Sequence, residues 1–218
     1  MTVEEKMPTI DEKATAATRA RYQRISGLYD KMERFAERRY SEWRPRLWSM
    51  VQGPKVLEVG VGTGKNMSYY PAGVQITAVD LTPGMLEYAK KRAAELNVAV
   101  DLQLGDAQQL DFPDNTFDNV VSTFVFCSVP DPALGLKELL RVTKPNGRLL
   151  MLEHVRAGNE LIGLMMDVMN PVMVRLSGAN INRRTVENVR QSGWQLEQVE
   201  EMGMKGIFKL IIARKNDG

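Results

Sequence analysis

The sequence predicts an α/β fold in three layers, with helices on both faces of a mostly parallel sheet. Between residues 55 and 155, short apolar runs alternate with longer segments of helical periodicity. Strands that alternate with helices of this length pair in parallel through right-handed crossovers. A glycine-rich turn follows the first apolar run, and an aspartate ends the second. The 218 residues suffice for one well-buried domain and are few for two, so we expect one domain with additions.

The composition excludes several classes of protein. A hydrophobic fraction of 44% and a charged fraction of 26% argue against disorder or a fibrous repeat. The net charge of +2 is too small to indicate a nucleic-acid partner, and the sequence shows no extended basic groove or stacking array. The single cysteine, Cys127, excludes a disulfide framework and a cysteine-rich zinc site, so we expect no metal and a reducing, cytoplasmic compartment. The chain has no run of about 18 apolar residues, so we predict no transmembrane helix.

Residues 1–51 are predicted to form an N-terminal extension. The first twenty residues have acidic groups and no apolar core, so they resemble neither a signal nor a transit peptide and are expected to be a loosely ordered tail. Residues 19–51 have helical periodicity, with nine basic against four acidic residues and thus a net charge of +5. This segment is either a helix with a solvated basic face or a helix that rests on an anionic membrane surface. Its apolar stripe comprises Tyr22, Ile25, Leu28, Tyr29, Met32, Phe35 and Ala36.

Residues 52–218 are predicted to form the core. Strands are expected at 55–59, 74–80, 98–107, 117–124 and 148–155. The clearest helix begins after Thr82, which suits an N-cap, and has Pro83 in its first turn. Further helices are expected at 131–144 and 183–193, and a hairpin at 194–215 adds two strands. An apolar, methionine-rich insertion at 158–180, interrupted by Asp167 and Pro171, follows the fifth strand.

The segment VLEVGVGTGKN, residues 56–66, decides which kind of nucleotide site the sequence predicts. A P-loop requires four residues between its glycines and a hydroxyl after the lysine, but Gly60 and Gly64 are separated by three, and Asn66 stands in place of the hydroxyl. A dinucleotide fingerprint places its third glycine three residues after the second, whereas Gly64 comes two after Gly62. The spacing argues against a phosphate site, and Lys65 is expected to be the first exposed residue of a helix.

Asp80 ends the second predicted strand, twenty residues after Gly60. A carboxylate at this position, beside the switch point of the sheet, can accept hydrogen bonds from both hydroxyls of a ribose. The predicted ligand is therefore an adenosine-type nucleoside whose other end needs close approach of the backbone and no phosphate clamp. S-adenosylmethionine has that shape.

Four motifs, in this order, resemble those of class I S-adenosylmethionine-dependent methyltransferases. They are VLEVGVGTG, AVDLTPGML, GDAQQLDFPDNTFDNVVS and ELLRVTKPNGRLLMLEHV, which together extend over about 100 residues. The resemblance implies a Rossmann-like methyltransferase fold with N-terminal helices and a mostly parallel, seven-stranded sheet that has an antiparallel C-terminal strand. It also implies S-adenosylmethionine as cofactor.

The same resemblance implies which residues bind the methionine and ribose parts of the cofactor. Gly60, Gly62 and Gly64 would lie against the methionine part, and Asp80 would hold the ribose diol. Glu58 matches an acidic position of the first motif, where it would either orient the turn and the cofactor's amino group or serve as a structural acid.

The adenine part would be bound by residues of the following loops. By resemblance, Leu81 and Met85 would pack near the adenine ring. Asp106 and Ala107 would meet its edge, and Thr123 would line the pocket after the fourth strand.

Within this superfamily, the chain resembles two groups most: the bacterial phosphatidylethanolamine N-methyltransferases and the ubiquinone or menaquinone methyltransferases. GLYDKM, residues 27–32, is similar to a segment of both groups, and VLEVGVGTGKNMSYYP is more similar to the phospholipid group. VFCSVPDP and LEHV also resemble animal alkyl-thiol methyltransferases. The expected acceptor is a lipid or small apolar molecule, with the amine of phosphatidylethanolamine or its methylated derivatives as the main hypothesis. A quinone precursor, a small thiol, and a cofactor-binding module without catalysis are the alternatives.

Methyl transfer is an in-line displacement that requires alignment and exclusion of water more than strong acid–base groups. His154, the only histidine, ends the fifth predicted strand and is either a proton acceptor or a structural residue. Tyr29 covers the cofactor, orients an amine, or belongs to the apolar core. Cys127 is expected to pack as a small apolar residue.

The basic helix and the insertion favour a lipid headgroup at an anionic membrane as the acceptor, and hence a peripheral enzyme on the inner face of that membrane. No pattern in the sequence predicts the oligomeric state.

Overall fold

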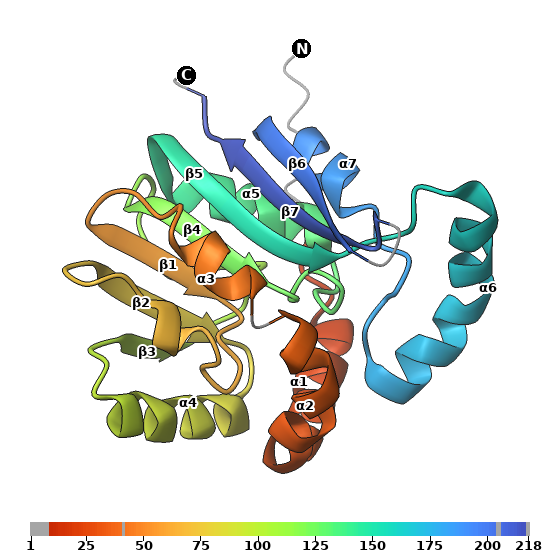
Figure 1. Cartoon of the computed structure of the whole chain (residues 1–218), viewed down its shortest axis with the longest axis horizontal. Coiled ribbons are helices and arrows are strands. Elements are labelled where there is room, and N and C mark those ends of the chain that lie inside the picture. The colour runs from red at the N-terminus through yellow and green to blue at the C-terminus, as the bar shows by residue number, and fades with distance from the viewer. Residues whose placement is uncertain (1–8, 41, 204–205, 217–218) are drawn as a thin grey trace.

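One seven-stranded sheet forms the centre of the computed structural model, which describes residues 9–40, 42–203 and 206–216 (Figure 1). The strand order is β3-β2-β1-β4-β5-β7-β6. The first five strands pair in parallel, and β7 runs antiparallel to both β5 and β6. The predicted α/β class and mostly parallel sheet are therefore confirmed. The strands are β1 Lys55–Val59, β2 Gln75–Asp80, β3 Asp101–Leu104, β4 Phe117–Thr123, β5 Thr143–His154, β6 Gln195–Gly203 and β7 Phe208–Arg214.

Helices cover both faces of the sheet. On one face, Leu47 and Trp48 of α3 pack with apolar residues of β1, β4, β5 and β7, and Leu86 of α4 packs on β2. On the other face, Leu136 of α5 packs with Val189 of α7 against the alternate residues of the same strands. Side chains of a strand alternate between its faces, so these helices bury both faces of the central strands. The helices are α3 Trp43–Trp48, α4 Pro83–Leu96, α5 Pro132–Val142 and α7 Thr185–Gln191.

Local sequence signals define where α4 and α5 begin. Pro83 occupies the first turn of α4 directly after Thr82, which is the N-cap residue. Asp131 is the N-cap of α5, and its side chain accepts hydrogen bonds from two backbone N–H groups of the first turn. Proline suits this first turn because the missing N–H would have no helical partner there. Both helix starts agree with the prediction.

The N-terminal segment forms helices, as predicted, but the first of them begins within the expected tail. Helix α1 spans Glu12–Ile25, a 3-10 turn η1 spans Ser26–Leu28, and α2 spans Tyr29–Tyr40. Residues 12–20 are thus helical, because Asp11 caps α1 by accepting a hydrogen bond from the Ala14 N–H at 2.9 Å. Residues 1–8 and the side chains of Phe35 and Ala36, part of the predicted stripe, lie outside the described portion.

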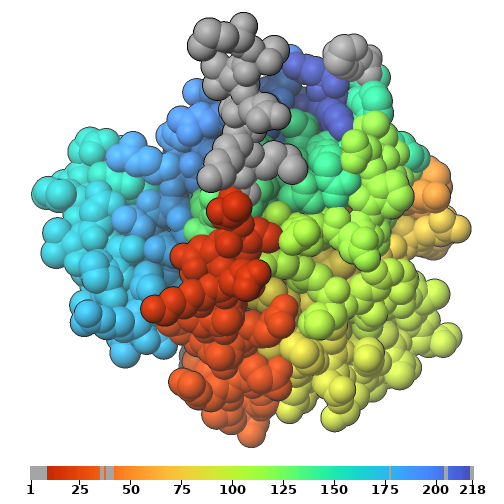
Figure 2. Space-filling model, turned by 180° about the vertical axis from the view of Figure 1, so that it is seen from behind, coloured from red at the N-terminus to blue at the C-terminus, as the bar shows by residue number. Residues whose placement is uncertain are grey.

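The methionine-rich insertion forms one helix, α6 Glu160–Ser177, with Pro171 inside it. Asp167 and Pro171, which interrupt the apolar run of the sequence, both lie within this one helix, which the sequence did not predict. Asn159 caps its start, and Gly178 ends it in the left-handed conformation. Helix α6 stands at the side of the molecule (Figure 1), and the view from behind shows α1 on the surface between α6 and the region of α4 (Figure 2). Within the described ranges, no helix is long and apolar enough to cross a bilayer.

Candidate functional site

A cavity lies at the carboxyl ends of β1, β2 and β4, where open α/β sheets bind ligands. It contains about 730 Å³ of space, including its open mouth. Nine of the residues predicted to form the site line this cavity: Tyr29, Gly60, Gly62, Asp80, Leu81, Met85, Asp106, Ala107 and Thr123. Glu58, Gly64 and His154 are not among its lining residues. The sequence thus predicted most of one wall of the cavity.

The glycine turn brings the backbone to the cavity. Gly60 and Gly62 have φ angles of +70° and +56°, which L side chains rarely adopt. A Cβ on Gly60 would come within 2.4 Å of Val125, whereas a Cβ on Gly62 would meet no protein atom within 4 Å. Gly60 is therefore required by the packing of the protein itself, and Gly62 leaves open space that a ligand can occupy.

The segment after the glycine turn is not the expected α-helix. Gly64 has a φ of +82° and packs against Met67, away from the cavity. Only a 3-10 turn, η2 Met67–Tyr69, follows, and Pro71 lacks the N–H that a continuing helix would need. Lys65 is 14% exposed rather than solvated, and its ammonium pairs with the Glu37 carboxylate at 3.2 Å.

Asp80 presents a carboxylate to the cavity that the backbone holds in place. Its Oδ2 accepts from the Gly62 N–H at 2.9 Å, and its Oδ1 accepts from the Thr82 N–H at 2.9 Å. Burial raises the pKa of this carboxyl, and the two backbone hydrogen bonds counteract part of the rise. Each carboxylate oxygen can accept a further hydrogen bond, so the group suits a vicinal diol.

Asp106 and its loop close the end of the cavity beyond Asp80. The Asp106 Oδ1 accepts from the Gln108 N–H at 2.9 Å. Gln108 is buried, donates to the Thr15 hydroxyl of α1 at 3.0 Å and accepts from the Asp131 N–H at 2.9 Å. This glutamine joins three segments around the cavity and was not predicted. Leu81, Met85 and Ala107 give the same end an apolar lining.

Helices α1 and α2 cover the cavity, and the sequence did not assign the residues of α1 to the site. Thr18 and Tyr22 of α1 line it together with Tyr29. The Tyr22 hydroxyl lies 2.5 Å from the Ser128 Oγ, and the two tyrosine rings are 6.4 Å apart. Burial raises the pKa of both tyrosines, so their hydroxyls stay protonated at neutral pH. Tyr22 belongs to the predicted apolar stripe, but its partner Ser128 is 106 positions away.

Asp30 connects α2 to the glycine turn and to α4. Its Oδ1 accepts from the Thr63 hydroxyl at 2.6 Å, and its Oδ2 accepts from Arg92 at 2.6 Å. The ammonium of Lys65 lies over the Tyr29 ring, 5.2 Å from its centroid. Asp30 is part of the GLYDKM segment, and these contacts give that segment a physical role: it fixes the covering helix against the glycine turn.

Glu58 lies beneath the glycine turn and does not reach the cavity. It is 1% exposed and accepts hydrogen bonds from Asn66 at 2.6 Å and from the Tyr70 hydroxyl. Burial raises the pKa of its carboxyl to about 7. Asn66 also donates to the Thr123 hydroxyl and accepts from Arg44. These contacts fit the structural acid, one of the two alternatives that the sequence left open.

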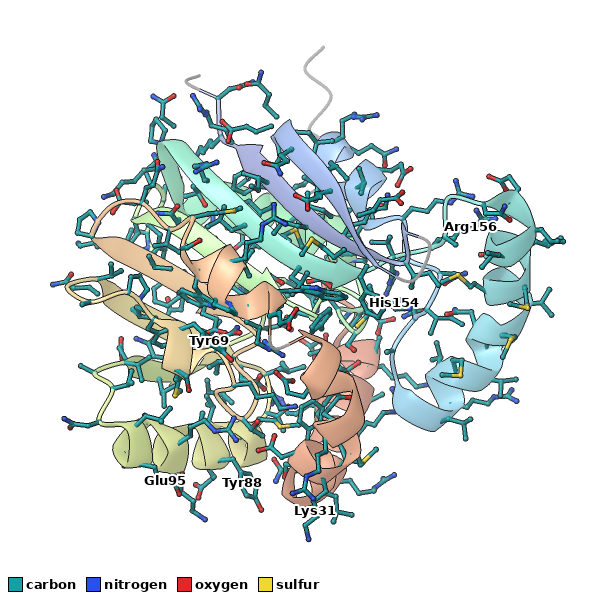
Figure 3. The ribbon with its side chains drawn as sticks, viewed as in Figure 1. Lys31, Tyr69, Tyr88, Glu95, His154 and Arg156 are labelled. Atoms are coloured by element: carbon teal, nitrogen blue, oxygen red, sulfur yellow. The ribbon has the colours of Figure 1, made fainter. Side chains whose placement is uncertain are left out.

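His154 lies where β5 leaves the sheet toward α6 (Figure 3), outside the cavity lining. Its ring packs edge-on against Phe208, with 5.3 Å between the centroids. Burial lowers the pKa of the imidazole, which keeps it neutral at pH 7. The two predicted catalytic residues are therefore separated, since Tyr29 lines the cavity and His154 belongs to an aromatic cluster.

Comparisons with known proteins show the family of the chain. The family model described as "Methyltransferase domain" matches residues 57–151. A demethylmenaquinone methyltransferase of Clavibacter sepedonicus is 31% identical over 187 residues, which cover 80% of this chain and 75% of the relative. The chain belongs to the S-adenosylmethionine-dependent methyltransferases.

Other similarities are more limited. A phosphatidylethanolamine N-methyltransferase of Cereibacter sphaeroides is 38% identical over 106 residues, 48% of this chain and 52% of the relative. The match thus spans about half the length of that curated relative. A solved structure from Thermotoga maritima, described as a possible histamine N-methyltransferase, has a TM-score of 0.69 at 21% identity and covers 91% of this chain and 100% of its own. It shows the shared fold.

The methyltransferase family implies S-adenosylmethionine, and the cavity fits it in two respects. Asp80 offers free acceptor positions to a ribose, and the open space at Gly62 admits close approach of a ligand. Among the residues that the structure describes, no group of three or more His, Cys, Asp or Glu side chains is placed to hold a metal ion.

Proposed function

We propose that this methyltransferase transfers methyl groups from S-adenosylmethionine to the amine of phosphatidylethanolamine or its methylated derivatives at an anionic membrane surface. The donor half rests on the family and on the cavity at the carboxyl ends of β1, β2 and β4. The acceptor half rests on one observation, the apolar outer face of α6, and on the similarity to the Cereibacter sphaeroides relative.

When bound, S-adenosylmethionine supplies a methyl group on a positively charged sulfur. In this proposal, Asp80 holds the ribose and the backbone at Gly62 lies along the donor. Tyr22 and Tyr29 close the cavity and exclude water, which favours attack by the intended nucleophile. The Tyr29 hydroxyl, protonated because burial raises its pKa, can accept a hydrogen bond from an amine and orient it, but it is not a base.

Helix α6 turns a row of apolar side chains toward solvent, while two of its polar side chains face the protein beside the buried Met166. On the inner side, Asp167 accepts from Arg156 at 3.1 Å and from Asn182 at 2.9 Å, and Asn170 accepts from the Ile181 N–H at 2.9 Å. Seven apolar residues on the outer side are 46% to 80% exposed. They are Leu161, Leu164, Met165, Val168, Met169, Val172 and Leu176.

The apolar outer side of α6 is best suited to contact with a lipid surface. An apolar stripe on a single helix can enter the boundary between headgroups and acyl chains, and large exposed apolar patches mark interaction sites. The exposed basic residues Arg24, Lys31 and Arg34 lie on α1 and α2, and the exposed Leu28 of η1 and Met32 of α2 lie among them in the sequence. Figure 3 shows Lys31 pointing outward from the end of this helix pair. A basic residue near anionic headgroups contributes about 1 kcal/mol.

A quinone-precursor C-methyltransferase is the second candidate, because the Clavibacter sepedonicus relative matches over most of the chain. That reaction needs a base to form the phenolate. The carboxylates that line the described cavity, Asp80 and Asp106, both accept from backbone N–H groups at the nucleoside end. This arrangement favours the amine, which needs only to be bound in its neutral form.

The acceptor is tested with S-adenosylmethionine labelled on its methyl group. The full chain is incubated with phosphatidylethanolamine vesicles, with a demethylated naphthoquinol in detergent, and with a small alkyl thiol, and the label in each product is counted. Transfer to the phospholipid alone supports the proposal. Transfer to the quinol or the thiol alone rejects the phospholipid as acceptor.

Flotation with vesicles that contain or lack anionic lipid tests the membrane contact. Val168→Glu places a charge in the centre of the outer face of α6 and should abolish flotation. Leu96→Glu changes an exposed leucine at the end of α4 and should leave flotation unchanged. Equal flotation of the two variants would show that α6 serves another contact. The same would follow if the wild type in lipid-free solution had the molecular mass of a dimer and Val168→Glu had a lower one, in which case the contact is with a second copy of the chain.

A further inference from the structure

Glu153 is a fully buried carboxylate that the reaction described above does not use. It lies on β5 with 0% exposure, and its Oε1 accepts from the Ser122 hydroxyl at 2.8 Å and from the N–H groups of Val125 and Phe126 at 3.1 and 3.4 Å. Its Oε2 has no hydrogen-bond partner in the described part of the chain. No Lys, Arg or His of that part forms an ion pair with it.

The groups that Glu153 binds belong to the segment that forms one wall of the cavity. Val125 and Ser128 line the cavity directly. Val125 also packs so close to the glycine turn that a Cβ on Gly60 would lie 2.4 Å from its side chain. The N–H of Phe124 is held from the same strand, by the Leu152 carbonyl at 2.8 Å. Strand β5 therefore fixes this wall against the glycine turn, and Glu153 provides the side-chain part of that attachment.

Structure alone does not explain why this residue carries a charge. Burying an ionised carboxylate without a cation is costly, and burial raises the pKa of Glu153 to about 7. A neutral glutamine would offer the same oxygen to the same three donors. Cys127 faces Glu153 from the wall segment, and burial together with this carboxyl raises its thiol pKa to about 12, so it supplies no positive charge. His154 follows on the opposite side of the strand, against Phe208.

A cationic ligand would offset this cost. The donor in the proposed function carries a sulfonium charge, whereas the product after methyl transfer, S-adenosylhomocysteine, has a neutral thioether in its place. We infer that Glu153 is a positioning residue of the donor site, which fixes the Phe124–Ser128 wall and whose negative charge behind that wall makes the cavity prefer the sulfonium donor over the neutral product. This inference rests on the donor in the proposed function and on no particular methyl acceptor.

Binding of donor and product to one variant separates this role from a structural one. We compare the dissociation constants of S-adenosylmethionine and S-adenosylhomocysteine by calorimetry at pH 8, where Glu153 is ionised. Glu153→Gln should weaken binding of the donor on the order of tenfold, because it removes the attraction between opposite charges in surroundings of low effective dielectric constant. The affinity for the product should change less than twofold. Ser122→Ala keeps the charge of Glu153 and removes one of its hydrogen bonds. It should therefore weaken the binding of donor and product by the same factor.

Each outcome decides the inference. An equal change for both ligands in Glu153→Gln, or no change for either, overturns it while leaving the proposed donor intact. A wild-type chain that binds neither ligand overturns the proposed function as well. If Glu153→Gln does not fold, Glu153→Asp provides the second test, because it keeps the charge and should keep the preference for the donor; loss of that preference in a folded Glu153→Asp chain overturns the inference.

Discussion

Gly62→Ala should close the donor site while leaving the protein folded. Gly62 lines the cavity with a φ of +56°, and a Cβ built there meets no protein atom within 4 Å. The added methyl group therefore does not clash with the protein. It occupies the space against which the donor is proposed to lie, so its effect should appear in binding more than in stability.

The stability cost of this substitution can be worked from the backbone. An alanine held in the left-handed region costs about 1 to 2 kcal/mol. For a chain of this size, 1 kcal/mol lowers the melting temperature by about 2 to 4 °C, so Gly62→Ala should melt a few degrees below the wild type. The N–H of residue 62 still donates to Asp80, which keeps the turn closed.

Gly73→Ala is the matched control. Gly73 has a φ of +77°, an equally empty Cβ position and an exposed place in a turn before β2, outside the cavity lining. Both variants should lose similar stability in a thermal melt, but only Gly62→Ala should lose affinity for S-adenosylmethionine in calorimetry, by at least about tenfold. Wild-type affinity in Gly62→Ala, or an equal loss in both variants, would refute the placement of the donor along this turn.

Two further predictions concern the residues around the turn. Burial raises the pKa of Glu58 to about 7, so its contribution to stability is present below the unfolded-state value of 4.5 and is lost as pH rises through 7. Glu58→Gln should therefore gain stability relative to the wild type between pH 5 and pH 8, by up to about 3 kcal/mol in urea unfolding; a constant difference would contradict the assigned pKa. Asp30→Ala should cost about 1 kcal/mol or less because Asp30 is 40% exposed, yet raise the donor's dissociation constant severalfold because no acceptor remains for the Thr63 hydroxyl; a donor affinity equal to that of the wild type would exclude this role.

The sequence predicted the donor side of the cavity because the residues concerned stand at, or directly after, the ends of predicted parallel strands. The glycine turn follows β1 directly, Asp80 ends β2, and Thr123 ends β4. Parallel strands bring their carboxyl ends to one edge of the sheet, so motif spacing and topology together place these residues side by side.

The covering helices and the β5 end could not be predicted in the same way. Tyr22 meets Ser128 only because α1 folds over the wall that follows β4. The sequence placed His154 at the end of a strand, but whether that end faces the cavity depends on the packing of β7 and Phe208 beside it. The start of α1 was a missed local signal, since Asp11 three residues before Ala14 is an ordinary N-cap pattern.

Calorimetric titration of the wild type beside Asp80→Ala shows whether this cavity binds S-adenosylmethionine with Asp80 on its ribose. Asp101→Ala, an exposed aspartate at the start of β3, is the control. Hydrogen bonds to a charged acceptor contribute about 1.5 to 3 kcal/mol each. The account predicts one bound donor per chain, at least about a hundredfold loss of affinity in Asp80→Ala, and no loss in Asp101→Ala. Absence of binding to the wild type, or equal affinity in Asp80→Ala, would contradict it.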